Sequence, residues 1–263
     1  MIGTTREINA ILTIAYRDML RFIRDPSRLV GTIILPIIFI GILGGSFASN
    51  LGKSIGYDFL TFTFTGVLAQ TLFQSTAFGL ISLIEDRDND FTQEIFVSPI
   101  SRYSIIFGKI FGESLVALVQ AVVVIGFGAI LGVSISLPLA LAMLPVSIVS
   151  CLLGGSFGMI LLSVFGSQRA ANQIMPFLIF PQFFLAGVFT PIRRLPWYID
   201  ILSKISPLRY AVDLTRGIFY AGQPEYDKVV LASPLVNLII MTAMFLIFLV
   251  IGTTLFVRSE RNR

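Results

Sequence analysis

The sequence lacks histidine altogether and contains a single cysteine, Cys151, which lies inside an apolar run. Zinc sites are built largely from cysteine and histidine, hydrolytic triads use a histidine base, and an intrachain disulfide needs two cysteines. We therefore predict no catalytic residue and no metal ligand. A membrane-embedded enzyme is the alternative, but it would need convergent catalytic side chains, and carboxylates are scarce in the apolar runs.

Charged residues are also scarce, at 13% of 263 residues against about 25% in soluble domains. Hydrophobic residues make up 55%, and the mean hydropathy is +0.88. A transmembrane helix needs roughly 20 apolar residues, so the chain has room for about six crossings with short connections. The net charge of +4 comes from basic residues at the ends of apolar runs, where they orient membrane proteins, so we expect no nucleic acid partner.

The apolar runs predict an all-α integral membrane protein in which residues 1–263 form one transmembrane domain. The six predicted transmembrane helices are residues 29–48, 59–84, 105–133, 139–165, 171–190 and 235–257. The first turns of the third contain Lys109 and Glu113, which precede its uncharged run. A charge at mid-bilayer costs about 2.5–3.5 kcal/mol, so we expect both residues to lie near the membrane surface.

Residues 4–25 precede the first span and predict an amphipathic helix lying on the membrane surface. Arg17, Arg21 and Arg24 share one face of this helix. The opposite face is apolar, with Ile8, Ile11, Leu12, Ala15, Met19, Phe22 and Ile23. The expected partner is membrane lipid, and a helix that contacts another protein is the alternative.

The distribution of lysine and arginine predicts the orientation. One side carries twelve of these residues, including the basic N-terminal segment and the arginines that follow the last span. The other side carries Lys53 and the six basic residues between positions 193 and 228. The bias predicts that both termini lie in the cytoplasm. We expect a multi-pass protein of a prokaryotic cytoplasmic membrane.

A phosphate-binding loop of the form GxxxxGK[ST] is absent. The two Gly-Lys pairs have Phe47 and Tyr103 where the first glycine belongs. We therefore expect this chain to bind no cofactor and to be no enzyme by itself. If ATP powers it, a separate subunit holds the ATP and Mg²⁺.

Neutral polar and aromatic residues within the spans are the candidates for a translocation path. They are Gln70, Phe73, Gln74, Asn172, Gln173, Phe177 and Phe180. Interhelical hydrogen bonding is the alternative role for the amides. Charges deep in the spans, which would point to ion-coupled transport, are essentially missing.

Residues 85–104 join the second and third spans on the predicted cytoplasmic side. The segment has an acidic start, a short helix-compatible stretch with Ile95, Phe96 and Val97, and a closing Pro99. We predict a small surface helix that docks into a partner, although the apolar residues could instead rest on lipid headgroups. The candidate coupling residues are Glu85, Asp86, Arg87, Thr92, Glu94, Ser98 and Pro99.

Residues 191–232 lie between the fifth and sixth spans on the predicted outer side. Pro191, Pro196 and Pro207 divide this segment into short pieces, because proline cannot continue a helix interior. Trp197 and Ile201 recur at helical spacing. We predict short helices that re-enter the membrane or lie in its interface.

The chain resembles the type-2 ABC exporter permeases over nearly its full length. The most specific match is Phe184–Pro191 (FLAGVFTP), followed by Leu195-Pro196 and then Pro207–Tyr210 (PLRY). The residues of this signature are Gly187, Thr190, Pro191, Leu195, Pro196, Pro207 and Tyr210. Thr92, Glu94, Ser98-Pro99 and Gly108-Lys109 also resemble the family's coupling region, although Phe91 stands where a glycine is common.

The resemblance implies that two permeases, a homodimer or a pair of paralogues, form a pore and that two cytoplasmic ATPase subunits bind the coupling segments. It also implies that residues 4–25 form an interfacial connecting helix. The expected function is ATP-driven export of an amphipathic drug, a lipid or a glycan. An ATP-independent channel or secondary transporter and a non-transporting anchor subunit are the alternatives.

Overall fold

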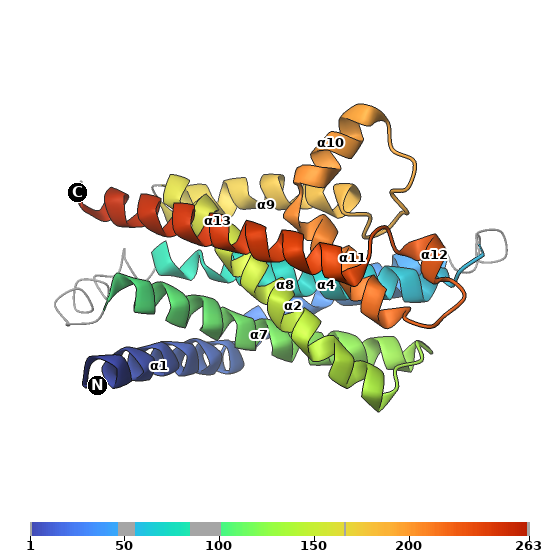
Figure 1. The fold of residues 1–263 in the computed structure, drawn as a ribbon. Helices are drawn as coiled ribbons and strands as arrows, with labels where there is room; N and C mark the ends of the chain where they lie inside the picture. The colour runs from blue at the N-terminus through green and yellow to red at the C-terminus, as the bar shows by residue number, and fades with distance from the viewer. Residues whose placement is uncertain (1, 47–55, 85–100, 166, 262–263) are drawn as a thin grey trace.

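The computed structural model describes residues 2–46, 56–84, 101–165 and 167–261, and every regular element in these ranges is a helix. The elements are α1 (Ile2–Arg24), α2 (Pro26–Ile38), the π-helix η1 (Phe39–Gly44), α4 (Phe59–Gly79), α7 (Arg102–Ile130), α8 (Leu137–Val164), α9 (Gln168–Leu185), α10 (Trp197–Ile205), α11 (Pro207–Phe219), α12 (Tyr226–Val229) and α13 (Pro234–Arg261). The long helices form one bundle, and both chain termini lie at the same end of it (Figure 1).

At least five of these helices begin where a short polar side chain caps the free backbone N–H groups of the first turn. In each case an oxygen of the capping side chain accepts a hydrogen bond from a backbone N–H two or three residues later. The capping residues are Asp25, Asp58, Ser101, Ser136 and Ser167. The polar residues that bound the apolar runs therefore also set the helix starts.

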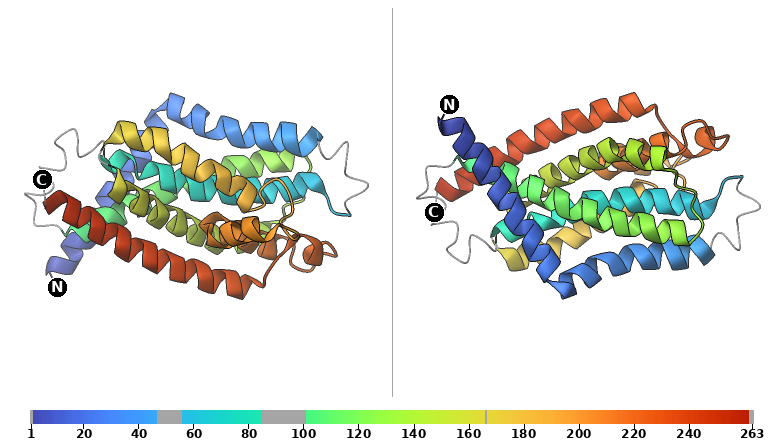
Figure 2. Two further views of the ribbon diagram at one scale, coloured as in Figure 1. Left: turned by 90° about the horizontal axis from the view of Figure 1, so that it is seen from above. Right: turned by 90° about the horizontal axis from the view of Figure 1, so that it is seen from below.

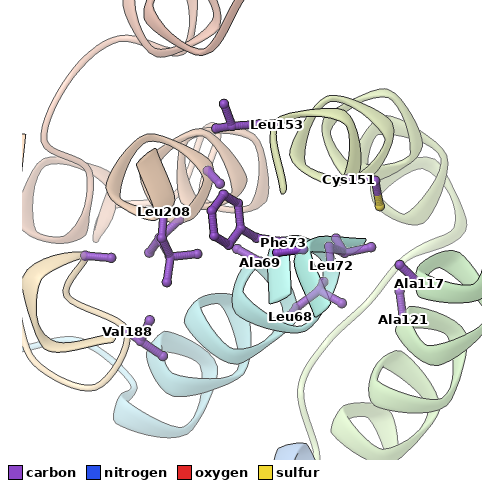
Figure 3. Close-up of a cluster of buried hydrophobic side chains, with 14 of the residues drawn as sticks. Leu68, Ala69, Leu72, Phe73, Ala117, Ala121, Cys151, Leu153, Val188 and Leu208 are labelled. Atoms are coloured by element: carbon purple, nitrogen blue, oxygen red, sulfur yellow. The ribbon is translucent and has the colours of Figure 1, made fainter. Parts of the chain in front are cut away.

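The central helix is α4, which packs against α7, α8 and α11 and is buried along most of its length. Figure 3 shows Leu68, Leu72 and Phe73 of α4 among small and apolar side chains of the neighbouring helices, including Ala117 of α7 and Leu208 of α11. By contrast, α2 and α13 expose most of their apolar surface. The arrangement leaves an apolar outer surface of the kind that faces lipid.

Pairs of glycines four residues apart bring helix backbones into close contact. A Cβ atom on Gly154 of α8 would lie 2.2 Å from the carbonyl oxygen of Phe73 on α4, and one on Gly158 would lie 2.6 Å from that of Ala77. No larger residue fits at either glycine without moving the helices apart. The α4–α8 contact therefore depends on glycine at both positions.

By length and composition, five helical stretches of the described chain could cross a membrane. They are Pro26–Gly44, Phe59–Ile84, Tyr103–Ile130, Leu137–Val164 and Tyr226–Phe256. The predicted fifth span, 171–190, is not among them. Its counterpart α9 has only 18 residues, and its first turn is polar, with Gln168 and Arg169. The sixth crossing therefore stays a prediction.

The predicted surface segments 4–25 and 191–232 contain helices at the two ends of the long bundle. Helix α1 lies obliquely across one end of the bundle, packed on α7 (Figure 2). At the other end, α10 exposes Trp197 and Tyr198, whereas α11 is buried against α4, α8 and α13. The segment 191–232 thus contains one exposed helix and one helix that enters the bundle.

Candidate functional site

A cavity of about 860 Å³ opens between α2, α4, α7 and α9 and extends to the bundle end at which α1 lies. Its wall has three chemical regions, which are neutral polar, aromatic and charged. The neutral polar residues include Gln70, Thr71, Gln74, Ser75, Gln120, Gln168 and Asn172. The aromatic residues are Phe39, Phe78, Phe180 and Phe183, and the charged residues are Asp18, Arg21, Asp25, Arg28, Lys109 and Glu113. This combination suits an amphipathic molecule, because apolar surface holds its body and a few polar groups orient it.

The polar wall is built mainly on α4, where Gln70 and Gln74 lie one turn apart. The Gln70 Nε2 donates to the Gln74 Oε1 over 3.3 Å. Gln70 is 5% exposed, and its Oε1 accepts no hydrogen bond from any described residue. A buried acceptor without a donor is costly, so this oxygen gains from a water or a ligand that donates to it.

The charged region is a set of ion pairs between three helices, here called the ionic network: Asp18 of α1, Arg28 of α2, and Lys109 and Glu113 of α7. The Lys109 Nζ lies 2.9 Å from the Asp18 Oδ2, and both side chains are 2% exposed or less. An Arg28 guanidinium nitrogen lies 3.0 Å from the Glu113 Oε2. Lys109 and Glu113 are themselves 4.0 Å apart. Buried charges are tolerated only when paired, and this network supplies the pairs.

Glu113 also contacts the C-terminal part of α4 and the residues just after it. The Ser82 hydroxyl donates to the Glu113 Oε1 over 3.4 Å. A Cβ on Gly79 would lie 2.1 Å from the Glu113 Oε2, so only glycine leaves room for this carboxylate. The ionic network therefore links α1, α2 and α7 to one another and, through Glu113, to the end of α4.

At the cavity rim, the Asp25 carboxylate caps α2 and accepts hydrogen bonds from the Ser27 hydroxyl (2.5 Å) and from the backbone N–H of Arg28 (3.0 Å). Both bonds favour the charged carboxylate, which holds the pKa of Asp25 below its ordinary value. The rim keeps a negative charge next to the Arg28 guanidinium at neutral pH.

Four of the seven predicted path residues line the cavity, and they are Gln70, Gln74, Asn172 and Phe180. The other three lie elsewhere. Phe73 is fully buried, with its ring 5.5 Å from that of Phe157 on α8. Gln173 is on the exposed side of α9, and Phe177 is 80% exposed on the same helix.

The predicted coupling residues Glu85, Asp86, Arg87, Thr92, Glu94, Ser98 and Pro99 lie outside the described residues. Of the predicted segment 85–104, the structure describes only the end. Ser101 caps α7, and residues 102–104 form its first turn.

The signature residues lie at the turns around α10. Gly187, with φ +71°, ends α9 in the left-handed conformation that favours glycine. Pro196 precedes α10, and Pro207 is the first residue of α11, a position where its missing N–H costs nothing. The Tyr210 hydroxyl donates to the carbonyl oxygen of Lys204 over 2.7 Å. The remaining signature residues are the exposed Thr190 and Pro191 and the half-buried Leu195.

Arg216 on α11 fixes this turn to α4. Its guanidinium donates to the carbonyl oxygens of Phe62 (3.2 Å), Gly187 (2.9 Å) and Val188 (3.2 Å). It also lies 3.6 Å from the centroid of the Phe62 ring, within reach of a cation–π interaction. One buried side chain thus joins the end of α9, the start of α4 and α11.

The sequence model of the family described as ABC-2 type transporter matches residues 9–220, about four fifths of the chain. The chain belongs to this family. It is 24% identical over 217 residues to ycf38 of Cyanophora paradoxa, which is named as a transport permease (81% of this chain, 74% of the relative). It is 24% identical over 230 residues to the doxorubicin resistance ABC transporter permease DrrC of Mycobacterium tuberculosis (86% and 80%). It is 21% identical over 227 residues to the daunorubicin resistance ABC transporter permease DrrB1 of Streptomyces coeruleorubidus (84% and 78%).

Sequence reasoning on this ABC-2 permease missed three features of the site. It took Arg28 only as a positive charge that orients the chain, did not single out Asp18, and assigned no role to Arg216. A usable signal was present, because a charged residue inside or beside an apolar run is rare and needs a partner. Lys109 and Glu113 carry that signal, and their partners lie on α1 and α2.

Proposed function

We propose that this ABC-2 permease is the transmembrane subunit of an exporter that moves an amphipathic drug, lipid or glycan out of the cytoplasm. A separate ATPase subunit binds ATP and Mg²⁺ and supplies the energy. The functional unit contains two permease chains, identical or paralogous, and two ATPases. The cavity between α2, α4, α7 and α9 carries this proposal, because it places neutral amides and phenylalanines around a space large enough for such a molecule.

The proposed topology has six crossings, with α9 as the fifth in chain order. Two observations support it. The chain termini lie at one end of the bundle, which an even number of crossings requires (Figure 1). In addition, α9 lines the cavity together with α2 and α4, so its polar first turn faces a space that admits water. The excess of lysine and arginine on the side of the termini supports a cytoplasmic position for both. The proposed location is the cytoplasmic membrane of a prokaryote.

Transport into vesicles tests the proposal. The permease is co-expressed with the ATPase that co-purifies with it, reconstituted into liposomes, and supplied with ATP and Mg²⁺ outside. The probes are doxorubicin, a fluorescent phospholipid and a lipid-linked oligosaccharide. We expect ATP-dependent uptake of at least one probe, and no uptake when the ATPase carries a substitution that stops hydrolysis. Uptake without any ATPase would support a channel or a secondary transporter instead, and no uptake would support an anchor subunit.

The coupling segment has a test of its own. We propose that Glu94 contacts the ATPase and that ATP-driven closure of the ATPase pair moves this segment. In the reconstituted complex, Glu94→Ala is expected to lower probe-stimulated ATP hydrolysis and probe uptake. Glu225→Ala, which removes a carboxylate near the other end of the bundle, is the matched control and is expected to change neither. Equal behaviour of the two variants would remove Glu94 from this role.

A further inference from the structure

Helix α1 contacts the first half of α7 at three successive levels. At the first level, the Glu7 carboxylate accepts hydrogen bonds from the backbone N–H of Ser101 at 3.1 and 3.2 Å. Bonds from the Ser104 side chain and from Ser101 hold the pKa of Glu7 below its ordinary value, so the acceptor is charged at neutral pH. The residue that caps α7 is thereby fixed to α1.

The second level is a close backbone contact made possible by two glycines of α7. A Cβ on Gly108 would lie 3.1 Å from the Ile14 Cβ and 3.2 Å from the Ile11 Cα. A Cβ on Gly112 would lie 2.9 Å from the Ala15 Cα. Two helices this close cannot slide along each other without side chains meeting backbone.

The third level is the Asp18–Lys109 pair, the shortest ion pair of the ionic network. Asp18 also accepts from the Arg17 guanidinium over 3.0 Å, and Lys109 lies one turn before Glu113. Glu113 in turn contacts Ser82 and Gly79 at the end of α4. Because residues 85–100 lie between the end of α4 and the start of α7 in the chain, both flanks of the proposed coupling segment meet at Glu113.

We propose that α1 and the first half of α7 form one rigid body, with Asp18 and Lys109 as the positioning residues that hold it together. Movement imposed on α1 or on residue 101 is then delivered through α7 to Glu113, and so to the charged region of the cavity. The inference rests on the proposed function only for the source of the movement. The rigidity itself is a property of this chain.

Distance measurements between spin labels test the rigidity directly. Ile23→Cys on α1 and Tyr103→Cys in the first turn of α7 are exposed positions, whereas the native Cys151 is fully buried and stays unlabelled. Pulsed electron paramagnetic resonance on the labelled chain in lipid nanodiscs is expected to give one narrow distance distribution. Adding Asp18→Asn or Lys109→Met is expected to broaden it, and the exchange Asp18→Lys with Lys109→Asp is expected to narrow it again.

Lys204→Met is the matched control, because it removes an ion pair of the same chemistry whose partners are 61% and 34% exposed. It is expected to leave the distribution unchanged. A broad distribution in the parent, or a narrow one in both neutralised variants, would overturn the inference. These outcomes do not depend on whether the chain transports anything.

A crosslink gives a second measurement that does not need the ion pair to be removed. Ile14→Cys and Gly108→Cys would place two Cβ atoms near 3.1 Å, slightly closer than the usual 3.5–4.5 Å of a disulfide, so a shift of a few tenths of an ångström closes the bond. In the complex with its ATPase, oxidation is expected to leave the rate of ATP hydrolysis unchanged. If oxidation stops hydrolysis and reduction restores it, α1 and α7 must move apart during the cycle and the proposed rigid body is wrong.

Discussion

Gly154→Ala is the sharpest test of how the bundle is held together. The added Cβ would lie 2.2 Å from the Phe73 carbonyl oxygen and 2.3 Å from the Thr76 Oγ1. Ordinary contact needs about 3.4 Å, so α4 and α8 must separate by about 1 Å or distort. Overpacking of this kind costs about 1–3 kcal/mol, and we expect about 3 kcal/mol because the nearest obstacle is backbone.

The single cysteine provides the assay. Cys151 is fully buried on α8, one turn before Gly154, so a thiol-reactive dye reports unfolding of this contact. At roughly 2–4 °C per kcal/mol for a chain near this size, the expected fall in Tm is roughly 6–12 °C. Dye reactivity before heating must stay low, which shows that the variant is folded at the start.

Gly126→Ala is the control, because nothing lies within 4 Å of the added Cβ and the position is on an exposed face of α7. Alanine is favoured over glycine in a helix by about 1 kcal/mol, so the Tm of this variant is expected to stay the same or rise. If Gly154→Ala melts at the parent temperature, or if both variants fall equally, the α4–α8 contact is not limited by glycine and the reasoning fails.

Three further predictions concern the turn that Arg216 fixes, the cavity, and the contact between α1 and α7. Arg216→Met leaves three carbonyl oxygens without their shared donor, and we expect a loss of about 3 kcal/mol in the same dye assay, against no change for the exposed Arg194→Met. Gln70→Leu removes the oxygen to which a bound probe could donate, a hydrogen bond worth about 1.5 kcal/mol, so we expect probe uptake into vesicles to change about tenfold. Phe177→Leu, on the exposed side of α9, is the control and is expected to leave uptake unaltered. Because the folded-state pKa of Glu7 is depressed, its contribution to stability is present above the unfolded pKa and is lost as the pH falls through the folded pKa. The Tm difference between the parent and Glu7→Gln is therefore expected at pH 7 and should disappear as the pH falls through the depressed pKa of Glu7; a difference that persists in strong acid would contradict the assigned charge.

The predictions that held depend on composition and on local chemistry. Scarce charge and long apolar runs indicated helical membrane segments, and the signature residues indicated the family that the comparisons identify. Helix starts were also within reach of the sequence, since Asp25-Pro26 both ends α1 and begins α2. These features are local, so a single sequence contains them.

The site was harder to predict because apolar and neutral polar residues are both spread around the whole circumference of α4. Periodicity then gives no preferred face, and so the sequence could not decide that Gln70 faces the cavity while Phe73 faces α8. The charges of α7 show the same limit. The position of Lys109 and Glu113 near the membrane surface stays a prediction, but the sequence did not indicate that both are buried in protein, where they pair with Asp18 and Arg28, 91 and 85 positions earlier in the chain. Partners so distant in sequence are set by tertiary packing.

Both chain termini emerge at the same end of the bundle, beside α1 and the last turn of α13 (Figure 1). In the proposed six-crossing topology, a domain fused to either end would lie in the same compartment, with no need for a linker that crosses the membrane. A single-chain exporter could be engineered by joining the ATPase to the N-terminus or to the C-terminus. Because α1 packs closely on α7, the C-terminal fusion is preferable. It leaves the N-terminus, and therefore α1, without an attached domain.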